Sequence, residues 1–369
     1  MKQNNKSIYR PLGDFIIQRR EKNKNYDVPI YGVSREGFIP PKQKDADISK
    51  YNVFYRNDFV FNPARMELNS IAFNDICDKA ICSSLYEVFY VDNTEELLPE
   101  YLNLFVKRNE FARLCDYVGN GSSREYCRVP QISLIKIPVP LIEVQRKIVA
   151  LWQGTRNLKL QNEGLVSPLM NLCKSYLQEL KKKYKTVAIG EYIEEVDERN
   201  TNGKFGMSDV RGLATSKQII DTKAKLEGVS LSSYKILKHN EFAYVSDTSR
   251  RGDKMSLGYN RDETTYLVSS ISTVFKIKDE NKLLPSYLFL QFNRPEFDRF
   301  ARFHSWGISR EVFSWEDMCR ITIPLPPIKI QEAIVKIHNC ADVANTIAKE
   351  SNDLLKIIGP ALVQRAINE

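Results

Sequence analysis

The sequence predicts an α/β (mixed α+β) fold in which two similar globular domains are separated by two long antiparallel helices. The chain of 369 residues contains an internal repeat whose offset is about half its length. Each copy combines β-rich runs with short helical patterns, and each ends in a proline-containing stretch before a long helical pattern. We therefore expect globular domains at residues 1–140 and 186–326, and helices at residues 141–185 and 327–369.

The composition is that of a globular protein, with 43% hydrophobic residues. No apolar run approaches the roughly 20 residues that cross a bilayer, and residues 1–6 are not followed by the apolar core of a signal peptide. The seven cysteines are odd in number and scattered, which favours reduced thiols over a disulfide framework or a zinc site. We expect a cytoplasmic protein without a membrane partner.

The net charge of +8 lies in the first half of the chain. Residues 1–185 contain 29 basic and 21 acidic side chains, whereas residues 186–369 contain 25 of each. Basic proteins can bind nucleic acids by neutralising phosphates. An excess of this size is also common in proteins that bind none, so charge alone does not decide the function.

A proline stretch marks the repeat most clearly. Residues 137–149 begin Ile-Pro-Val-Pro and residues 323–335 begin Ile-Pro-Leu-Pro, at an offset of 186. Both stretches carry a glutamine at the same position, Gln145 and Gln331. Proline disfavours helix in the residue before it but is tolerated in a first helical turn. Each stretch therefore predicts an extended segment followed by the start of a helix.

Further matches keep the same order along the chain. Residues 97–102 match residues 283–288 at the offset of 186, and residues 12–16 match residues 189–193 at an offset of 177. Such small changes of offset are expected where surface loops take insertions. Pro99 and Pro285 predict helix starts. The β-rich runs that we expect to form strands are residues 53–55, 59–61, 86–90, 242–245 and 272–276.

The long helices should bury one face each. The expected face of the first helix is Val144, Ile148, Leu151, Thr155 and Leu158, and that of the second is Ile330, Ile334, Ile337, Ala341 and Ala344. Pro168 and Pro360 predict a kink or break late in each run. The matched patterns favour packing of the two helices against each other over two separate surface helices.

The sequence offers no self-contained catalytic site. It has neither a G-x-x-x-x-G-K-[ST] phosphate loop nor a G-x-G-x-x-G after a strand. The three histidines lack the spacing of metal ligands. The acidic cluster at residues 191–198 is better interpreted as a solvated face than as a nuclease site. We therefore expect no catalytic or metal-binding residues in this chain.

Two pairs of repeated loops are candidate DNA contacts. Residues 120–124 (Asn-Gly-Ser-Ser-Arg) match residues 306–310, and residues 62–70 face residues 247–256. Glycine permits close backbone approach, serine donates to phosphate, and arginine contacts phosphate or guanine. The alternative is a turn whose arginine pairs with a local acid, Glu125 or Glu311. The predicted DNA-contacting residues are Arg65, Asn69, Ser70, Asn120, Gly121, Ser123, Arg124, Ser249, Arg250, Arg251, Lys254, Ser305, Gly307, Ser309 and Arg310.

Over nearly its full length the chain resembles the specificity subunit of type I restriction-modification systems. The resemblance rests on the motif Ile-Pro-x-Pro-x-x-x-x-Gln at residues 137–145 and 323–331, where each conserved helical region of that family begins. The segments at residues 12–14 and 189–191 fit as well. Residues 61–72 resemble a segment common in target-recognition domains, whereas the second domain departs from that segment.

This resemblance implies that each target-recognition domain reads one half of a bipartite, asymmetric site in double-stranded DNA. The helices would set the spacing between the half-sites and dock the modification (methyltransferase) subunits. A restriction subunit with translocase and endonuclease activity would complete an anti-phage complex. S-adenosylmethionine, ATP and Mg are expected on these partners, and no cofactor is expected in this chain. The alternatives are a recognition subunit of a related type II system, a fused enzyme, or a coiled-coil scaffold that binds no DNA.

Overall fold

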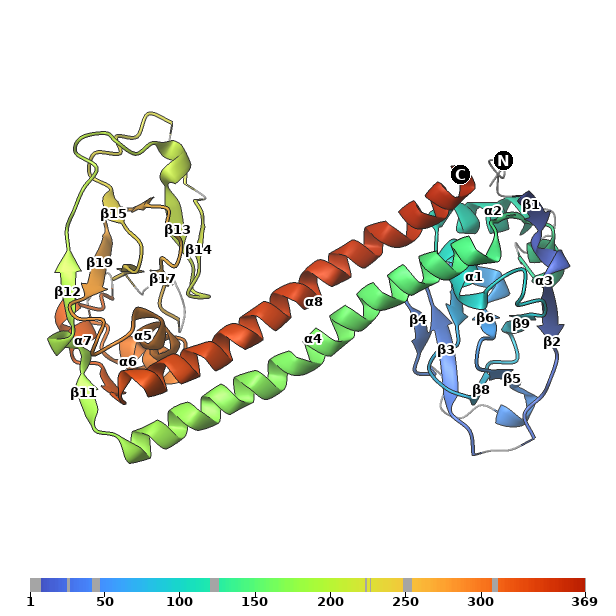
Figure 1. Ribbon diagram of the computed structural model, residues 1–369, viewed down its shortest axis with the longest axis horizontal. Coiled ribbons are helices and arrows are strands. Elements are labelled where there is room, and N and C mark those ends of the chain that lie inside the picture. The colour runs from blue at the N-terminus through green and yellow to red at the C-terminus, as the bar shows by residue number, and fades with distance from the viewer. Residues whose placement is uncertain are drawn as a thin grey trace. The chain divides into compact units, whose positions relative to one another are not determined.

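The computed structural model describes residues 8–24, 27–41, 47–119, 126–222, 224–225, 227–247, 254–306 and 311–368. The chain divides into two compact units, each of which contains part of both long helices (Figure 1). Unit 1 comprises Met1–Glu163 and Thr346–Glu369, and unit 2 comprises Gly164–Asn345. The boundaries expected from the sequence separate the globular domains from the helices, whereas the compact units divide each helix between them. The expected boundaries therefore remain a prediction.

Unit 1 is built on two four-stranded sheets. The first sheet has the antiparallel order β2 (Ile16–Arg19), β9 (Glu87–Val91), β6 (Phe59–Phe61) and β7 (Ile71–Phe73). The second has the order β4 (Gly37–Ile39), β3 (Ile30–Ser34), β8 (Lys79–Cys82) and β5 (Asn52–Tyr55), with β3 and β8 parallel. These strands confirm the three β-rich runs predicted in this half.

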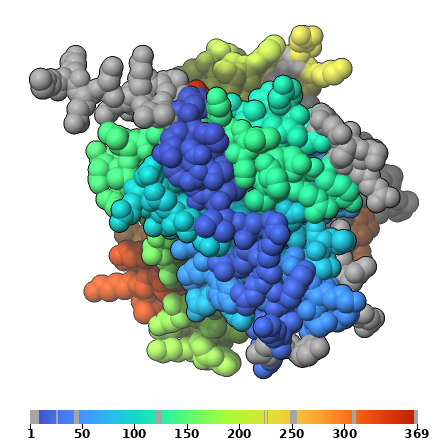
Figure 2. Space-filling model, turned by 90° about the vertical axis from the view of Figure 1, so that its right-hand side faces the viewer, coloured from blue at the N-terminus to red at the C-terminus, as the bar shows by residue number. Residues whose placement is uncertain are grey.

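The remaining short elements of unit 1 pack around these sheets. They are β1 (Ile8–Pro11), which pairs with β10 (Lys136–Val139), the 3-10 turns η1 (Leu12–Asp14), η2 (Ile48–Lys50) and η3 (Pro63–Arg65), and the helices α1 (Pro99–Val106), α2 (Asn109–Gly119) and α3 (Val129–Ser133). Of these, η2 packs against the second sheet. Figure 2 shows the N-terminal strands, in dark blue, packed against the teal and green segment that contains α2 and α3.

Alternation along the strands divides the core of unit 1 into two layers. Phe59 and Phe89 stack at 4.9 Å between ring centroids and share a buried cluster with α1 and α2. The intervening Val60 and Val88 point to the other face and pack with Phe54 of the second sheet. Successive side chains of a strand point to opposite faces, so one sheet can support both layers.

Unit 2 repeats this arrangement. Its main sheet has the order β12 (Ile193–Val196), β19 (Ser272–Ile277), β16 (Phe242–Val245) and β17 (Leu257–Tyr259). The second layer consists of β13 (Arg211–Leu213) with β14 (Ile219–Asp221), and β15 (Lys235–Leu237) with β18 (Tyr266–Val268). Phe242 and Phe275 stack at 5.0 Å, at the positions equivalent to Phe59 and Phe89. The two strands predicted in this half are confirmed.

The other elements of unit 2 follow the same plan. They are β11 (Thr186–Ala188), which pairs with β20 (Thr322–Pro324), the turns η4 (Ile189–Glu191) and η5 (Met207–Asp209), and the helices α5 (Pro285–Phe292), α6 (Pro295–Phe303) and α7 (Trp315–Cys319). Helices α1 and α5 begin at Pro99 and Pro285, as predicted.

The long helices are α4 (Ile142–Lys183) and α8 (Ile328–Asn368), and each is uninterrupted. The sequence predicted a kink or a break at Pro168 and Pro360, and the prediction of a break is wrong. Each proline leaves the carbonyl four residues earlier without its helical donor. Those carbonyls belong to Gly164 and Lys356, which are exposed, so water can satisfy them.

Within each unit the two helix segments run antiparallel (Figure 1). In unit 1, Ile148 and Val363 belong to the same core, and Gly359 faces Trp152. In unit 2, the thiol of Cys173 lies 3.9 Å from the carbonyl oxygen of Ile334. None of the helices in the described part of the chain combines the length and apolar character needed to span a membrane.

The expected buried face is correct for α8 and only partly correct for α4. Ile334, Ala341 and Ala344 of α8 are buried, and so are Ile148 and Thr155 of α4. Leu151 and Leu158, however, are about half exposed. Helix α4 carries two neighbouring apolar stripes, and the sequence pattern does not tell which one faces the core.

Candidate nucleic-acid interface

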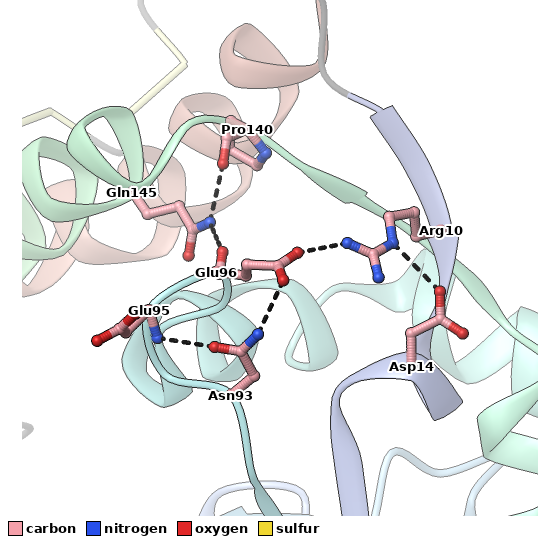
Figure 3. Close-up of polar contacts among 7 residues, drawn as sticks. All are labelled: Arg10, Asp14, Asn93, Glu95, Glu96, Pro140 and Gln145. Carbon is pink, nitrogen blue, oxygen red and sulfur yellow. Dashed lines mark hydrogen bonds and ion pairs between the residues drawn. The ribbon is translucent and has the colours of Figure 1, made fainter.

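The repeated glutamine clamps the start of each long helix. Gln145 is fully buried, and its Oε1 accepts a hydrogen bond from the backbone N–H of Leu98 at 2.8 Å. Its Nε2 donates to the carbonyl oxygens of Glu96 at 2.7 Å and Pro140 at 2.9 Å (Figure 3). One amide therefore joins α4, the proline loop before it and the segment that leads into α1.

Unit 2 contains the same clamp. Gln331 is fully buried, accepts from the N–H of Leu284 at 2.9 Å and donates to the carbonyls of Lys282 and Pro326, each at 2.9 Å. Buried polar groups are costly unless they are paired, which explains why the proline motif needs glutamine at this position. The motif is structural, and its glutamine has no surface to offer a ligand.

A polar cluster centred on Arg10 surrounds the clamp of unit 1. Arg10 pairs with Asp14 at 3.2 Å and also with Glu96, whose carboxylate accepts from Asn93 at 2.8 Å (Figure 3). The positions equivalent to Arg10 and Glu96 in unit 2 are Val187 and Lys282. The clamp is therefore shared between the units, while the exposed charges around it are not.

The glycine of each leading segment is fixed by close packing. A Cβ on Gly13 would lie 2.9 Å from the Cβ of Ser133, and a Cβ on Gly190 would lie 2.7 Å from that of Cys319. The two contacts are equivalent, because η1 and η4 approach the C-terminal ends of α3 and α7. Together with the clamp they fix the frame from which the surface loops project.

Two clefts open on the surface of unit 1, on either side of the turn at residues 83–86. Cleft A has a volume of about 460 Å³ and cleft B of about 590 Å³. Asn62, Leu85 and Tyr86 line both. The basic residues that line cleft A are Arg19, Arg20, Lys22 and Arg128, and those that line cleft B are Arg35 and Arg65.

Two of the cations in cleft A are paired with acids. Arg19 stacks over the rings of Tyr55 and Tyr90 and binds the buried carboxylate of Asp58 at 2.6 Å. Burial raises the pKa of Asp58, while the bond from Arg19 opposes that shift. Arg128 pairs in the same way with Glu87 at 2.9 Å. These two arginines are held in place, and their charges are largely balanced.

The other cations of the clefts have no acidic partner among the residues that the structure describes. Arg20 donates to the side chain of Gln18 at 3.0 Å, and Lys22 donates to that of Asn52 at 2.7 Å. Arg35 donates to the side chain of Asn109, and the exposed side chain of Arg65 lies at the end of η3. Cleft A therefore carries two cations without an acidic partner, and cleft B carries two cations beside one lining carboxylate, that of Glu67, so both have a positive excess, as a phosphate-binding surface requires.

The predicted segment at residues 62–70 is only partly exposed. Arg65 lines cleft B, but Asn69 and Ser70 are 2% and 4% exposed. The hydroxyl of Ser70 donates to the carbonyl of Val33 at 3.2 Å, and Asn69 turns the chain with a φ of 54°. We correct the prediction for these two residues, because both present almost no surface to DNA; the hydroxyl of Ser70 is used within the fold, whereas the buried amide of Asn69 has no hydrogen-bond partner among the described residues.

Much of the predicted site lies outside the described residues. This applies to Asn120, Gly121, Ser123, Arg124, Ser249, Arg250, Arg251, Gly307, Ser309 and Arg310, which remain predictions. The residues that flank these loops are described. In unit 1 the N–H of Cys127 donates to the carbonyl of Pro63 at 3.0 Å, and in unit 2 that of Phe313 donates to Ser246 at 2.9 Å. In both units, therefore, the residue that follows one predicted loop is hydrogen-bonded to a residue at the start of the other.

Two further predicted residues of unit 2 are described. Lys254 is exposed, as a DNA contact requires, whereas Ser305 is buried and donates to the carbonyl of Ala301 at 2.6 Å. We therefore withdraw Ser305 from the candidate contacts. Glu311, the local acid considered as an alternative partner for the loop arginine, is bound by Arg302 at 3.2 Å.

Sequence reasoning missed the basic floor of cleft A and the turn between the clefts. Arg19 ends β2, and Arg20 and Lys22 follow it closely in the sequence, so these basic residues gather at the end of one strand. Leu85 carried no signal of its own. Among the described residues, no group of three or more His, Cys, Asp or Glu side chains is arranged to hold a metal ion.

Comparison with known proteins agrees with this arrangement. A family model described as "Type I restriction modification DNA specificity domain" matches residues 13–163 and 173–356, one match in each half. The fold is similar to that of a type I restriction-modification S subunit from M. genitalium, with a TM-score of 0.59 and 14% identity, covering 99% of this chain and 98% of that one.

A second similar structure is the HsdS subunit from Thermoanaerobacter tengcongensis, with a TM-score of 0.42 and 17% identity, covering 100% of this chain and 98% of that one. No curated protein sequence matches the chain. The family match extends over most of the residues and falls on both repeats. The chain therefore belongs to the family of type I restriction-modification DNA specificity domains, whose role is DNA recognition.

Proposed function

We propose that unit 1 and unit 2 each read one half of a bipartite, asymmetric DNA site. The observation that carries this proposal is the repeated convergence of two loops in each unit, at Cys127 with Pro63 and at Phe313 with Ser246. The frame is the same in both units while the loop residues differ. Two equivalent frames with different contact residues are what a protein needs to read two different half-sites.

We propose further that the helices dock modification subunits. Four leucines of α4 recur at 7-residue intervals and are 44–51% exposed, namely Leu151, Leu158, Leu165 and Leu172. A spacing of seven keeps them on one side of the helix, as in the seam of a coiled coil. A continuous exposed apolar stripe of this kind is typical of a protein interface.

The chemistry of the assembled complex belongs to the same proposal. Adenine methylation with S-adenosylmethionine would reside on the modification subunits, and translocation and cleavage with ATP and Mg on a restriction subunit. This chain would supply recognition to a cytoplasmic complex and would hold no cofactor itself. The support for this division is the specificity role of the family, together with the absence from the sequence of phosphate-loop and dinucleotide-binding motifs.

A domain exchange tests the half-site proposal. Residues 186–326 are replaced by the second recognition domain of another family member, and the chimaera is expressed with its modification subunits. Sequencing of methylated DNA should then show a change in one half of the site only, with the wild-type complex as reference. The proposal fails if both halves change, or if neither does while the chimaera folds and methylates DNA.

The docking proposal has a separate test. Leu158→Asp should abolish co-purification of the modification subunit, because a charge in an apolar seam is not compensated. Gln161→Asp, three residues further along the same helix and exposed, is the matched control and should leave the complex intact. Equal recovery of the modification subunit with Leu158→Asp and wild type would show that docking uses another surface.

A further inference from the structure

The turn at residues 83–86, between the clefts of unit 1, carries an exposed aliphatic side chain, and we call this turn tip 1. Leu85 is 78% exposed although it lines both cleft A and cleft B. The turn connects β8 of one sheet with β9 of the other, so it stands at the edge where the two layers meet. Leu85 is thus the apolar crest of a ridge whose two sides carry unpaired cations.

Tip 1 is held rigidly. The N–H of Tyr86 donates to the carbonyl of Ser83 at 3.0 Å, and the N–H of Leu85 donates to the hydroxyl of Ser83 at 3.3 Å. The carbonyl of Tyr86 accepts from the side chain of Asn52 at 2.7 Å, and that side chain also accepts from Lys22. A ridge fixed in this way can present Leu85 without losing much conformational entropy on binding.

Unit 2 has the same turn at the equivalent position, residues 269–272, which we call tip 2. The N–H of Ser272 donates to the carbonyl of Ser269 at 2.9 Å, matching the bond in tip 1. Ile271 takes the place of Leu85 and is 62% exposed. A single exposed aliphatic residue is ordinary on a protein surface. Its recurrence at one position of two otherwise divergent units is not explained by the fold, since neither side chain contributes to a core.

The surroundings of Leu85 indicate what it touches. Arg20 and Lys22 lie on one side of the ridge, and Arg35 and Arg65 lie on the other. In duplex DNA, the two phosphate backbones border a major groove about 12 Å wide, where base edges and the thymine methyl group are accessible. A ridge flanked by cations on both sides is complementary to a groove flanked by phosphates on both sides.

We propose that tip 1 enters the major groove of the half-site read by unit 1, with Leu85 in apolar contact with base edges. The phosphates of the two strands then lie at clefts A and B. The matching turn of tip 2 assigns Ile271 to the other half-site, although unit 2 has Val196 and Asp197 where unit 1 has Arg19 and Arg20. This inference rests on the proposed half-site function and adds to it a specificity-determining residue in each unit.

The test uses the full chain in complex with its modification subunits, as wild type and as Leu85→Asn. Sequence preference is measured by methylation of a duplex library with randomised positions. Affinity is measured on the preferred duplex over a range of salt concentrations. Leu134→Asn is the matched control, because Leu134 is also an exposed leucine of unit 1 and lines neither cleft. Leu85→Met keeps an apolar tip and should behave like wild type.

Leu85→Asn should relax the preference at one or two base pairs of a single half-site and weaken binding to the preferred duplex about tenfold. The dependence of affinity on salt should not change, because no phosphate contact is lost. Ile271→Asn should relax the other half-site, and Leu134→Asn should match wild type.

Three outcomes would overturn the proposal. The first is an unchanged preference in Leu85→Asn, and the second is the same relaxation in Leu134→Asn. The third is a loss of affinity in Leu85→Asn that comes with a changed salt dependence and no change of preference. If the wild-type complex prefers no duplex at all, the half-site function itself is wrong, so the two failures are distinguishable.

Discussion

Unit 1 and unit 2 share their buried frame and differ in their second layer and in their charge. Both have the same main sheet, the same aromatic stack and the same glutamine clamp. The second layer of unit 1 is one four-stranded sheet, whereas that of unit 2 is two strand pairs joined by a single parallel bridge between Val210 and Leu267. The buried frame is thus repeated in the two units, whereas the surface built on it differs.

The charge difference falls at the proposed DNA-contacting surface of unit 1. Where unit 1 has Arg19, Arg20 and Lys22, unit 2 has Val196, Asp197 and Arg199 at the offset of 177. Arg199 is bound by Asp197 at 2.9 Å, so its charge is balanced. Clefts A and B of unit 1 therefore hold an excess of cations that has no counterpart at these positions of unit 2, although most of the net charge of the first half lies in residues 151–185, with 7 basic and 2 acidic side chains. The two units should therefore hold the DNA backbone with different strength.

The largest expected effect tests the shared frame. Gln145→Leu and Gln331→Leu each leave a buried N–H and two buried carbonyls unpaired, which should destabilise the affected unit by about 3 kcal/mol. Hydrogen exchange of the full chain resolves the two units. Because the clamps have the same geometry, the two losses should be equal, and Gln153→Leu on the exposed side of α4 should change little. A loss in one unit only would break the equivalence of the clamps.

The second test concerns a buried ion pair that only unit 2 has. Asp298 accepts from Lys217 at 2.5 Å and from the N–H of Met255 at 3.0 Å, while its equivalent in unit 1 is Ala112. Asp298→Asn leaves the buried ammonium of Lys217 uncompensated and should destabilise unit 2 by roughly 2–3 kcal/mol. Adding Lys217→Met should recover part of that loss. Urea unfolding followed by hydrogen exchange measures both, and a double variant no better than the single one would contradict the pairing.

The third test compares the two surfaces by salt dependence. Arg20→Ala and Lys22→Ala should each lower the slope of log affinity against log salt by up to about 0.9 and weaken DNA binding about tenfold. Arg199→Ala should have a smaller effect, because its charge is already balanced by Asp197. Binding of the complex to its methylated site is measured at several salt concentrations. If all three variants had the same slope of log affinity against log salt concentration, the expected difference in charge between the two DNA-contacting surfaces would be wrong.

The smallest effect is a pH dependence that Lys107 gives to unit 1. Burial lowers the pKa of Lys107 to about 8, and its ammonium donates to the carbonyls of Arg35 and Ile71. In the unfolded chain the pKa is near its usual value of 10.5. Between these values the unfolded state binds more protons, so the stability of unit 1 should rise with pH, by about 1 kcal/mol from pH 8 to 9.5.

Lys107→Met should remove this rise from unit 1. Unit 2 has Asn293 at the equivalent position, but burial also lowers the pKa of its Lys217, so unit 2 should keep a pH dependence of its own in this variant. Thermal unfolding of wild type and variant at matched pH values measures the difference. A rise of the same size in both proteins would assign it to another group.

The frame could be predicted from sequence because its signals are local and occur twice. Pro99 and Pro285 each occupy the first position of a helix, which is a local preference of proline. The β-rich run at residues 59–61 likewise forms a strand. The orientation of α4 could not be predicted in this way. Leu151 and Ile148 are equally apolar, and only the shape of the core that α4 meets decides which of them is buried.

The recognition surface was harder to predict than the frame. Ser70 has the hydroxyl group expected of a DNA contact, but this hydroxyl donates a hydrogen bond to the carbonyl of Val33, which lies 37 positions away in the sequence. Leu85 looks like a core residue by composition, yet its turn places it on the surface. For Ser70 a long-range contact decides the role of the side chain, and for Leu85 a turn between two sheets does; the apolar or polar character of a residue reveals neither.

The division of each long helix between the two units has a consequence for synthesis. Unit 1 takes its last helical segment from residues 346–368, and Val363 is fully buried in its core. All of unit 2 lies between the two pieces of unit 1 in the chain. At 5–20 residues per second, the ribosome needs roughly 10–40 s to make the intervening segment. Unit 1 is therefore the first unit to begin synthesis and the last to be completed. Its core cannot be completed until the residues that follow unit 2 have been translated.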